Sequence, residues 1–309
     1  MIFDIVVVGS INMDMVVKVQ RRPAKGETLL GTDFFMSPGG KGANQAYAAA
    51  KLGASVAMIG QVGDDLFADQ LIGNLRAAGA ETQYIAKAQG VSSGVAFISV
   101  DNEGDNSIIV APGANQRITP AFVRQYEEII ASAKLLMVQL EIPLESVVEA
   151  VACAHRHRVS VLLDPAPAQP LPESLLHMVN YILPNEHEIA QLTGVKVTDA
   201  QTAQIAGKVL RDKGVETVLA KLGEQGVVAI SGKQTFVVPG IPVKAVDTTA
   251  AGDAFAGAFA KTLAAGQDLQ SAVHFANAVG AITVTRHGAQ SSMPDMAEAD
   301  AFIKEGGLS

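Results

Sequence analysis

The sequence has little that would mark a secreted, membrane or nucleic-acid-binding protein. Cys153 is the one cysteine among 309 residues, which excludes an internal disulfide and suits a reducing cytoplasm. No apolar run reaches the roughly 18 residues of a transmembrane helix, and no basic segment precedes an apolar one as in a signal peptide. The 23 basic side chains are outnumbered by 31 acidic ones and form no cluster, which disfavours nucleic acid as a partner.

Two common nucleotide-binding motifs are also missing. The segment Gly39-Gly-Lys-Gly42 is rich in glycine, but no Ser or Thr follows Lys41, so it is not a P-loop. The apolar run 4–9 predicts a first strand, yet no Gly-x-Gly-x-x-Gly follows it. An NAD-linked oxidoreductase is therefore disfavoured.

Apolar strands and helices alternate along the rest of the chain. Strands are predicted at 56–59, 135–140, 159–163 and 217–220, and helices at 65–78, 144–155, 250–266 and 269–286. This order predicts an α/β fold with a doubly wound, mainly parallel sheet and helices on both faces. No Pro- or Ser-rich linker divides the chain, so we expect one domain over 1–309.

Two stretches follow a different pattern, typical of hairpins. Residues 15–19 pair with 28–36, and 93–100 pair with 105–110 across a turn at Asn102-Glu-Gly104. We expect these strands, from about 12–36 and 93–112, to form a small β-sheet inserted in the main domain.

The segment Asp247-Thr-Thr-Ala-Ala-Gly-Asp253 opens an apolar helix. Small residues let the backbone approach a ligand, and the N–H groups at a helix start attract an anion. A carboxylate there would repel a phosphate but suits a base that deprotonates a hydroxyl beside it, so we interpret Asp253 as a base for phosphoryl transfer. The alternative is that Asp247 only caps the helix and Gly-Asp only makes a turn.

Polar residues near the N-terminus suggest a sugar site. Asn12 and Asp14 are two residues apart on an extended segment, so both point to one side. A carboxylate can accept two hydroxyl hydrogens, which suits a vicinal diol. Lys41 and Asn44 lie in the glycine-rich loop before an Ala-rich helix, and Glu141 follows a predicted central strand. A solvated strand end is the alternative for the first pair.

Together these segments resemble the ribokinase-like carbohydrate kinase family over essentially the whole length. The resemblance depends on four motifs in family order: Gly39-Gly-Lys-Gly-Ala-Asn-Gln-Ala46, Pro184-Asn-Glu-His-Glu188, Leu222-Gly-Glu-Gln-Gly226 and Asp247-Thr-Thr-Ala-Ala-Gly-Asp253. It implies an ATP-dependent kinase that phosphorylates the 5-hydroxyl of D-ribose, giving ribose 5-phosphate.

The resemblance assigns roles to the quoted residues. Asp253 is the general base, and the backbone amides of Ala250, Ala251 and Gly252 form an anion hole. The sugar site consists of Asn12, Asp14, Gly40, Lys41, Asn44, Glu141 and Asp253. The ATP site consists of Asn185, Lys221, Leu222, Gly223, Glu224, Gln225, Gly226, Gly252 and Asn277.

Metal ions are implied in the same way. Asn185 and Glu188 help to hold Mg²⁺ through waters, although Asn185 could instead cap the helix that follows. A K⁺ site is implied beside the anion hole, at Asp247, Thr249, Thr283, Arg286, Gly288 and Ser292. The small sheet is expected to form a lid over the sugar and to carry a homodimer contact.

Two positions depart from the family pattern. Lys221 stands where Thr or Ser is frequent, and could pair with ATP phosphates or be merely exposed. Asp164 stands where Asn is frequent. The substrate also stays open between ribose, deoxyribose, another pentose or ketose, and a nucleoside. A non-catalytic sugar or nucleotide sensor of the same fold is the alternative from another functional class.

Overall fold

The main sheet has nine strands, and its order explains where a ligand can bind. The computed structural model describes residues 2–102 and 106–306. The strand order is β13-β12-β11-β10-β9-β8-β1-β4-β5, and only β12 and β13 run antiparallel to their neighbours. The strands are β1 (Phe3–Val8), β4 (Val56–Gly63), β5 (Ile85–Ala88), β8 (Ala133–Val138), β9 (Ser160–Leu163), β10 (Tyr181–Ile182), β11 (Thr217–Lys221), β12 (Val227–Ser231) and β13 (Thr235–Val238).

The chain order reverses at β1. After β1 the chain adds β4 and β5 on one side, and then β8, β9, β10 and β11 on the other. In open parallel sheets such a switch point leaves a crevice at the carboxyl ends of the strands, where ligands bind. Ser10 and Asn12 follow β1 directly, and Glu141 follows β8, so the predicted sugar-site residues meet at this point.

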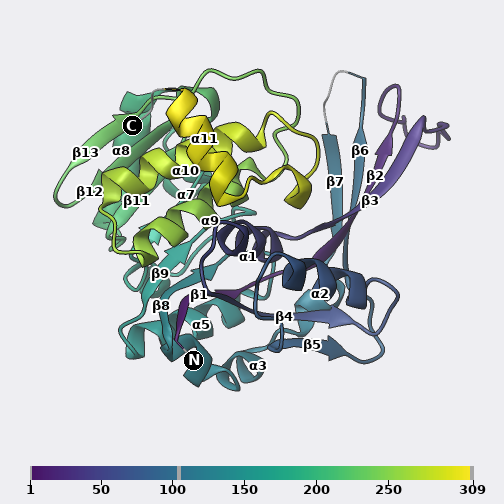
Figure 1. Cartoon of the computed structure of the whole chain (residues 1–309), viewed down its shortest axis with the longest axis horizontal. Coiled ribbons are helices and arrows are strands. Elements are labelled where there is room, and N and C mark those ends of the chain that lie inside the picture. Colours follow the sequence, from purple (N-terminus) through teal and green to yellow (C-terminus); the bar gives the residue numbers. More distant parts are fainter. Residues whose placement is uncertain (1, 103–105, 307–309) are drawn as a thin grey trace.

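Helices cover both faces of the sheet (Figure 1). The first face carries α1 (Lys41–Lys51), α2 (Ala68–Ala77), α9 (Ala251–Ala264), α10 (Leu269–Thr283) and α11 (Met296–Glu305). The second face carries α3 (Pro120–Arg124), α4 (Glu127–Ala131), α5 (Leu144–Arg156), α6 (Glu173–Leu176), α7 (Glu186–Thr193) and α8 (Ala200–Asp212). The predicted doubly wound α/β fold is confirmed.

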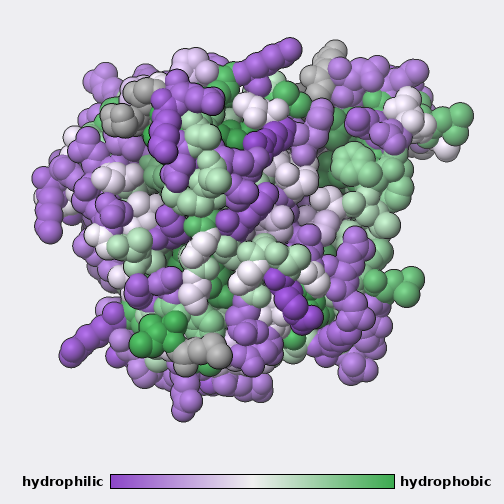
Figure 2. Space-filling view, in the orientation of Figure 1, coloured by the Kyte–Doolittle hydropathy of each residue, from purple (hydrophilic) through white to green (hydrophobic). Residues whose placement is uncertain are grey.

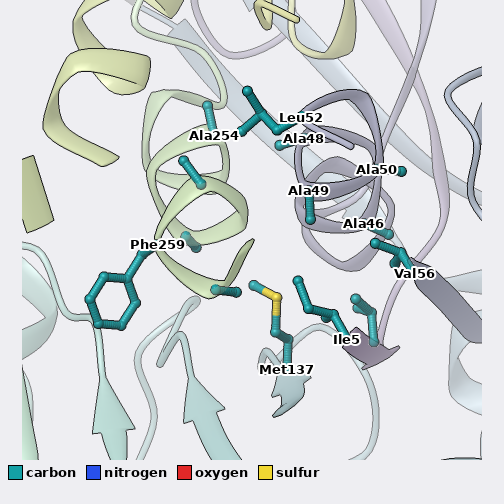
Figure 3. Packing of buried hydrophobic residues seen from close by; sticks show 14 of the residues in the cluster. Ile5, Ala46, Ala48, Ala49, Ala50, Leu52, Val56, Met137, Ala254 and Phe259 are labelled. Carbon is teal, nitrogen blue, oxygen red and sulfur yellow. The ribbon is translucent and has the colours of Figure 1, made fainter. Parts of the chain in front are cut away.

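Small side chains bring α1 and α9 close together. Figure 3 shows Ala48 and Ala49 of α1 beside Ala254 of α9, above Met137 of the sheet. A Cβ atom on Gly257 would lie 2.7 Å from Ala48 Cβ, nearer than real Cβ atoms approach. Glycine at 257 therefore sets the spacing between the two helices that carry the predicted sugar and phosphate residues.

A second sheet of four strands stands apart from the first (Figure 1). Its order is β3-β2-β6-β7, with β2 (Asn12–Lys18), β3 (Asp33–Gly39), β6 (Gly94–Val100) and β7 (Asn106–Ala111). Both predicted hairpins are confirmed, and β2 and β6 join them by parallel pairing. β3 begins at Asp33, so the prediction of a strand from residue 28 was wrong. Of the predicted turn, Glu103 and Gly104 lie outside the described residues.

The helices also show where Cys153 lies and whether any of them could span a membrane. Cys153 is 2% exposed within α5 and packs in the core of the second face. Within residues 2–102 and 106–306, no helix combines the length and the apolar character needed to cross a membrane.

Candidate active site

The first turn of α9 holds Asp253 in a buried position. Ala250 precedes the helix in the left-handed region, with φ at 58°, and so turns the chain into the helix without a side-chain cap. Asp253 is the third helical residue and is 5% exposed. Ala251 N–H donates a long bond of 3.3 Å to Thr248 O. The start of α9 thus combines N–H donors with a buried carboxylate.

Two amide side chains of α1 hold the Asp253 carboxylate. Asn44 Nδ2 donates to Oδ2 at 2.9 Å, and Gln45 Nε2 donates to Oδ1 at 3.1 Å. Gln290 Nε2 donates to Asn44 Oδ1 at 3.0 Å, which orients the Asn44 amide toward the acid. Burial raises the pKa of Asp253 to about 6, while the Lys41 ammonium and the two amide bonds oppose that rise.

Asn12 and Asp14 lie on β2 and point to one side, as the spacing predicts. Asn12 is 2% exposed, and its Oδ1 accepts from Asn115 Nδ2 at 2.7 Å. Burial raises the pKa of Asp14 to about 7, and the charges of Glu141 and Asp253 add to the rise. The three carboxylates therefore lie close enough for their charges to interact.

Glycines let the backbone approach Asp14 and Asn12 closely. A Cβ atom on Gly39 would lie 2.1 Å from Asp14 Oδ2. Gly40 has φ at 90°, and a Cβ there would lie 2.8 Å from Asn12 N. Only glycine fits both demands at position 40, which explains why the loop before α1 is rich in this residue.

Glu141 is tied to the start of α1. Its Oε2 accepts from Ser10 Oγ at 2.6 Å and from Lys41 N at 3.0 Å. Lys41 is partly buried. Burial alone would lower the pKa of its ammonium, but four carboxylates, with Asp253 foremost, hold that pKa above its ordinary value. Lys41 therefore remains charged among Asp253, Asp164, Glu141 and Glu188.

Asn185 and Glu188 form a reciprocal cap at the start of α7. Asn185 Oδ1 accepts from Glu188 N, and Glu188 Oε2 accepts from Asn185 N, both at 2.8 Å. The cap that the sequence offered as an alternative is thus present. Burial and the nearby Asp164 raise the pKa of Glu188, and the Lys221 ammonium opposes them.

A cleft of about 660 Å³ lies next to the predicted nucleotide loop. Its lining includes Val238, Gly240, His274, Phe275 and Asn277. Asn277 Nδ2 donates to Pro239 O at 2.9 Å. The loop 222–226 packs tightly behind this lining, because a Cβ on Gly226 would lie 2.1 Å from Val238 O.

Asp247 does not cap α9, so the interpretation of that residue as a helix cap was wrong. Its Oδ1 accepts from Thr249 N and its Oδ2 from Gly288 N, both at 2.9 Å. These bonds hold the pKa of Asp247 below its ordinary value, against the effect of burial. They also join the loop before α9 to the loop after α10, 41 residues later.

Of the other predicted K⁺ residues, two have buried hydroxyls. Thr283 and Ser292 are fully buried, and their hydroxyls donate to Val279 O and Ala289 O. Arg286 Nη2 instead lies 2.9 Å from Glu298 Oε1, on α11. The Arg286 side chain is thus engaged by an acid outside the predicted set.

Lys221 is paired rather than merely exposed. Its Nζ lies 3.2 Å from Asp164 Oδ1, and the two side chains are 15% and 2% exposed. Gln45 Nε2 donates to Asp164 Oδ2 at 2.8 Å as well as to Asp253. Gln139 Nε2 in turn donates to Gln45 Oε1 at 2.6 Å.

Several residues of this network were absent from the predicted site: Ser10, Gln45, Asn115, Gln139, Asp164 and Gln290. One signal in the sequence points to Gln45. It is a polar residue next to Asn44 in a helix whose other buried residues are Gly and Ala. A polar side chain at a buried helical position needs a hydrogen-bond partner, and in this case the partners are acids.

Comparisons with known proteins identify the family of the chain. The family model "pfkB family carbohydrate kinase" matches residues 3–296. A ribokinase of Bacillus subtilis is 42% identical over 300 residues, covering 97% of this chain and 99% of that protein. A deoxyribokinase of Salmonella typhi is 39% identical, covering 97% and 98%.

A solved structure gives the same result. The structure of Arabidopsis thaliana ribokinase complexed with ribose and ATP has a TM-score of 0.91 and 32% identity, covering 98% of this chain and 99% of that one. The family match spans both sheets and every segment of the candidate site. The chain therefore belongs to the pfkB family of carbohydrate kinases.

Proposed function

We propose that the chain is an ATP-dependent ribokinase, which transfers the γ-phosphate of ATP to the 5-hydroxyl of D-ribose. One observation carries the proposal: a buried carboxylate, Asp253, stands in the first turn of α9 with both oxygens held by Asn44 and Gln45. The identity to ribokinases supports the choice of sugar.

Asp253 acts as the general base in this mechanism. The sugar hydroxyl oxygen bonds to the γ-phosphorus, the bond from that phosphorus to the leaving ADP oxygen breaks, and the hydroxyl proton passes to Asp253. A pKa of about 6 leaves the carboxylate ionised at neutral pH yet basic enough to accept the proton. A positioned base contributes about 10²–10⁴-fold.

The N–H groups at the start of α9 stabilise the transferring phosphoryl group. Ala250, Ala251 and Gly252 supply them, and they need no reorganisation during the reaction. The weak bond from Ala251 to Thr248 is one that a phosphate oxygen would replace. Lys41 adds a positive charge on the sugar side.

The sugar lies between β2 and α1. Asp14 accepts two ring hydroxyls, and Asn12, Lys41, Asn44 and Glu141 meet the others, close to the backbone at Gly40. The buried carboxylates of Asp14 and Asp253 support this placement, because a polyhydroxyl ligand supplies the donors that buried acids need. Deoxyribose would leave Asp14 partly unpaired, which favours ribose.

The nucleotide lies along the loop 222–226 and in the cleft beside Asn277. The adenine occupies that cleft, and the phosphates run past Lys221 toward Gly252. Mg²⁺ would accompany the phosphates and keep several of its waters, so Asn185 and Glu188 would hold it through water molecules. Their reciprocal cap fixes both side chains for that task.

A K⁺ ion is proposed where Asp247 joins Gly288. The residues fit it: Asp247 offers an ionised carboxylate, and Thr283 and Ser292 offer buried hydroxyls. Asp247 N–H also donates to Val284 O, next to Thr283. The ion would supply fixed positive charge beside the anion hole, with Thr249, Arg286 and Gly288 completing the surrounding loops.

The second sheet is proposed as a lid and as the contact of a homodimer. Met36, Met15, Phe97 and Ile109 are successive cross-strand neighbours, and Met36, Phe97 and Ile109 are exposed by 46%, 50% and 72%. Figure 2 shows hydrophobic surface over this sheet, on the right. A second copy would cover this row, because a two-fold dimer packs the same apolar patch of one subunit against that of the other. We place the enzyme in the cytoplasm, where ATP is available.

The test is ATP consumption with Mg²⁺ and K⁺ across ribose, 2-deoxyribose, arabinose, xylose, fructose and ribonucleosides. We expect the highest kcat/KM for ribose. A preference for deoxyribose would assign the activity of the 39%-identical relative instead. Sugar binding without ATP consumption would replace the kinase by a sensor.

A further inference from the structure

The cation of Lys221 lies at the start of α9. Lys221 ends β11, and its Nζ is 3.3 Å from the point where a Cβ on Gly252 would stand. The absence of a side chain at 252 leaves room for the ammonium beside the helix N-terminus. The side chain is only 15% exposed, so water weakens its charge less than at the surface.

A buried acid holds this ammonium. Asp164 Oδ1 is 3.2 Å from Lys221 Nζ, and Asp164 is 2% exposed. Its other oxygen accepts the Gln45 amide, whose nitrogen also donates to Asp253. A single amide nitrogen therefore connects the counter-ion of Lys221 to the base.

Stability alone does not explain the pair. Apolar residues of similar volume commonly stabilise a core as well as a buried ion pair does, because both ions lose hydration. Without the ammonium, the carboxylates of Asp164, Asp253 and Glu188 would face the phosphates with Lys41 as their main cation. A second cation at the helix start offsets that repulsion.

We propose that Lys221 binds the γ-phosphoryl group during transfer, and that Asp164 positions both the Lys221 ammonium and, through Gln45, the base Asp253. This inference depends on the kinase function proposed above. Lys221 is then a catalytic residue and Asp164 a positioning residue. Lys221 and Asp164 are also the two positions that depart from the family pattern, and the structure places them in contact.

Four variants test the pair: Lys221→Met, Lys221→Arg, Asp164→Asn and the double variant Asp164→Asn/Lys221→Met. We expect Lys221→Met to lower kcat by about 10- to 100-fold, since one donor to the transition state is commonly worth about 10²–10³-fold and Lys41 remains. The dissociation constant for ribose without nucleotide should stay within twofold. Lys221→Arg should recover most of the turnover.

The double variant separates chemistry from stability. It removes both buried charges and leaves neither unpaired. Its melting temperature should therefore match that of the wild type, while its kcat stays low. Asp164→Asn should shift the acid limb of the pH–rate profile to lower pH, because a negative charge beside Asp253 is lost. A purely structural pair would leave kcat of the folded double variant at the wild-type value.

Lys233→Met is the matched control, on the exposed β12–β13 turn. Recovery of full turnover by the double variant, or wild-type kcat in Lys221→Met, would overturn the inference while leaving the kinase function intact. A wild type that phosphorylates no sugar would overturn the proposed function itself, and the inference with it.

Discussion

Asn44 Nδ2 lies 2.9 Å from Asp253 Oδ2, although 209 positions separate the two residues in the sequence. One belongs to α1 and the other to α9, and small side chains let these helices approach closely (Figure 3). The position of the proposed base is therefore set by helix packing as much as by its own turn.

Gly257→Ala tests this dependence on packing. The added methyl would lie 2.7 Å from Ala48 Cβ and 2.8 Å from Gln45 O, so α1 and α9 must separate. We expect a loss of about 1–3 kcal/mol in the free energy of unfolding. Turnover should fall at least tenfold, because displacements of about 1 Å at an active site are costly. Urea denaturation and steady-state kinetics measure the two effects.

Gly73→Ala is the control for that variant. Gly73 lies in α2 with nothing within 4 Å of an added Cβ, so alanine should stabilise the chain by about 0.4–1 kcal/mol. Equal effects of the two substitutions would contradict a special role for the α1–α9 contact.

The pKa of Asp253 predicts the acid limb of the reaction. The base must be ionised, so kcat at saturating ribose should fall about tenfold per pH unit below pH 6 and level off above it. Asp253→Asn should abolish the limb and lower turnover by about 10²–10⁴-fold. A variant that kept a tenth of wild-type turnover would exclude Asp253 as the base.

The same pKa has a consequence for stability. Burial raises it from 3.8 to about 6, so the folded protein binds the proton more tightly than the unfolded chain. Stability contributed by this group is present at low pH and is lost as the pH rises from about 4 to 6. Asp253→Asn should therefore melt no lower than the wild type at pH 8, measured by circular dichroism.

Asp14 should couple sugar binding to proton release. Its pKa is about 7 in the empty site, and hydroxyl donors from ribose favour the ionised carboxylate. Ribose affinity should increase from pH 6 to pH 8, with release of nearly one proton at pH 6. Calorimetry in two buffers of different ionisation enthalpy measures the release. Asp14→Asn should release none, and a pH-independent wild type would refute the assignment.

Exchange of sodium for potassium tests the proposed cation site. Activity should rise with K⁺, because the proposed site is where the loops of Asp247 and Gly288 meet, beside the proposed anion hole. Asp247→Ala should remove the difference between the two ions and lower stability, as two backbone N–H groups lose their acceptor. Indifference of the wild type to the ion would eliminate the site.

The exposed row on the second sheet predicts a dimer that one charge can break. Ile109→Glu should shift the mass in light scattering from a dimer to a monomer, because an unpaired charge at a covered apolar face is costly. Ile205→Glu, on α8 and 52% exposed, is the control and should leave the mass unchanged. A monomeric wild type would reject the contact.

Local patterns predicted the fold well because each is a property of a short segment. The alternation of strands and helices indicated the parallel sheet, and the spacing of Asn12 and Asp14 indicated that both point to one side of β2. The glycines at 39 and 40 stand where an added Cβ would clash with Asp14 and with the backbone at Asn12.

The remaining features depend on contacts between distant segments. Asp247 has the residue type of a helix cap, yet it binds Gly288 because the loop after α10 folds back onto it. Gln45 joins Asp164 to Asp253 only once three elements are packed together. Likewise, Lys221 lies in the interior because β11 is two strands from β9, which brings its ammonium to Asp164.

The strand at the switch point of the sheet, β1, is also the first to be synthesised. β1 can pair only after β4 and β8 have been synthesised. The alanine face of α1 can pack only after α9 has been made, and α9 begins 200 residues after α1 ends. At about 5–20 residues per second, a ribosome needs roughly 10–40 s to make that interval. During that interval the nascent chain contains Asn44 and Gln45 but not their hydrogen-bond partner Asp253. We therefore expect a truncated translation product that ends before α9 to consume no ATP, because it lacks the proposed base.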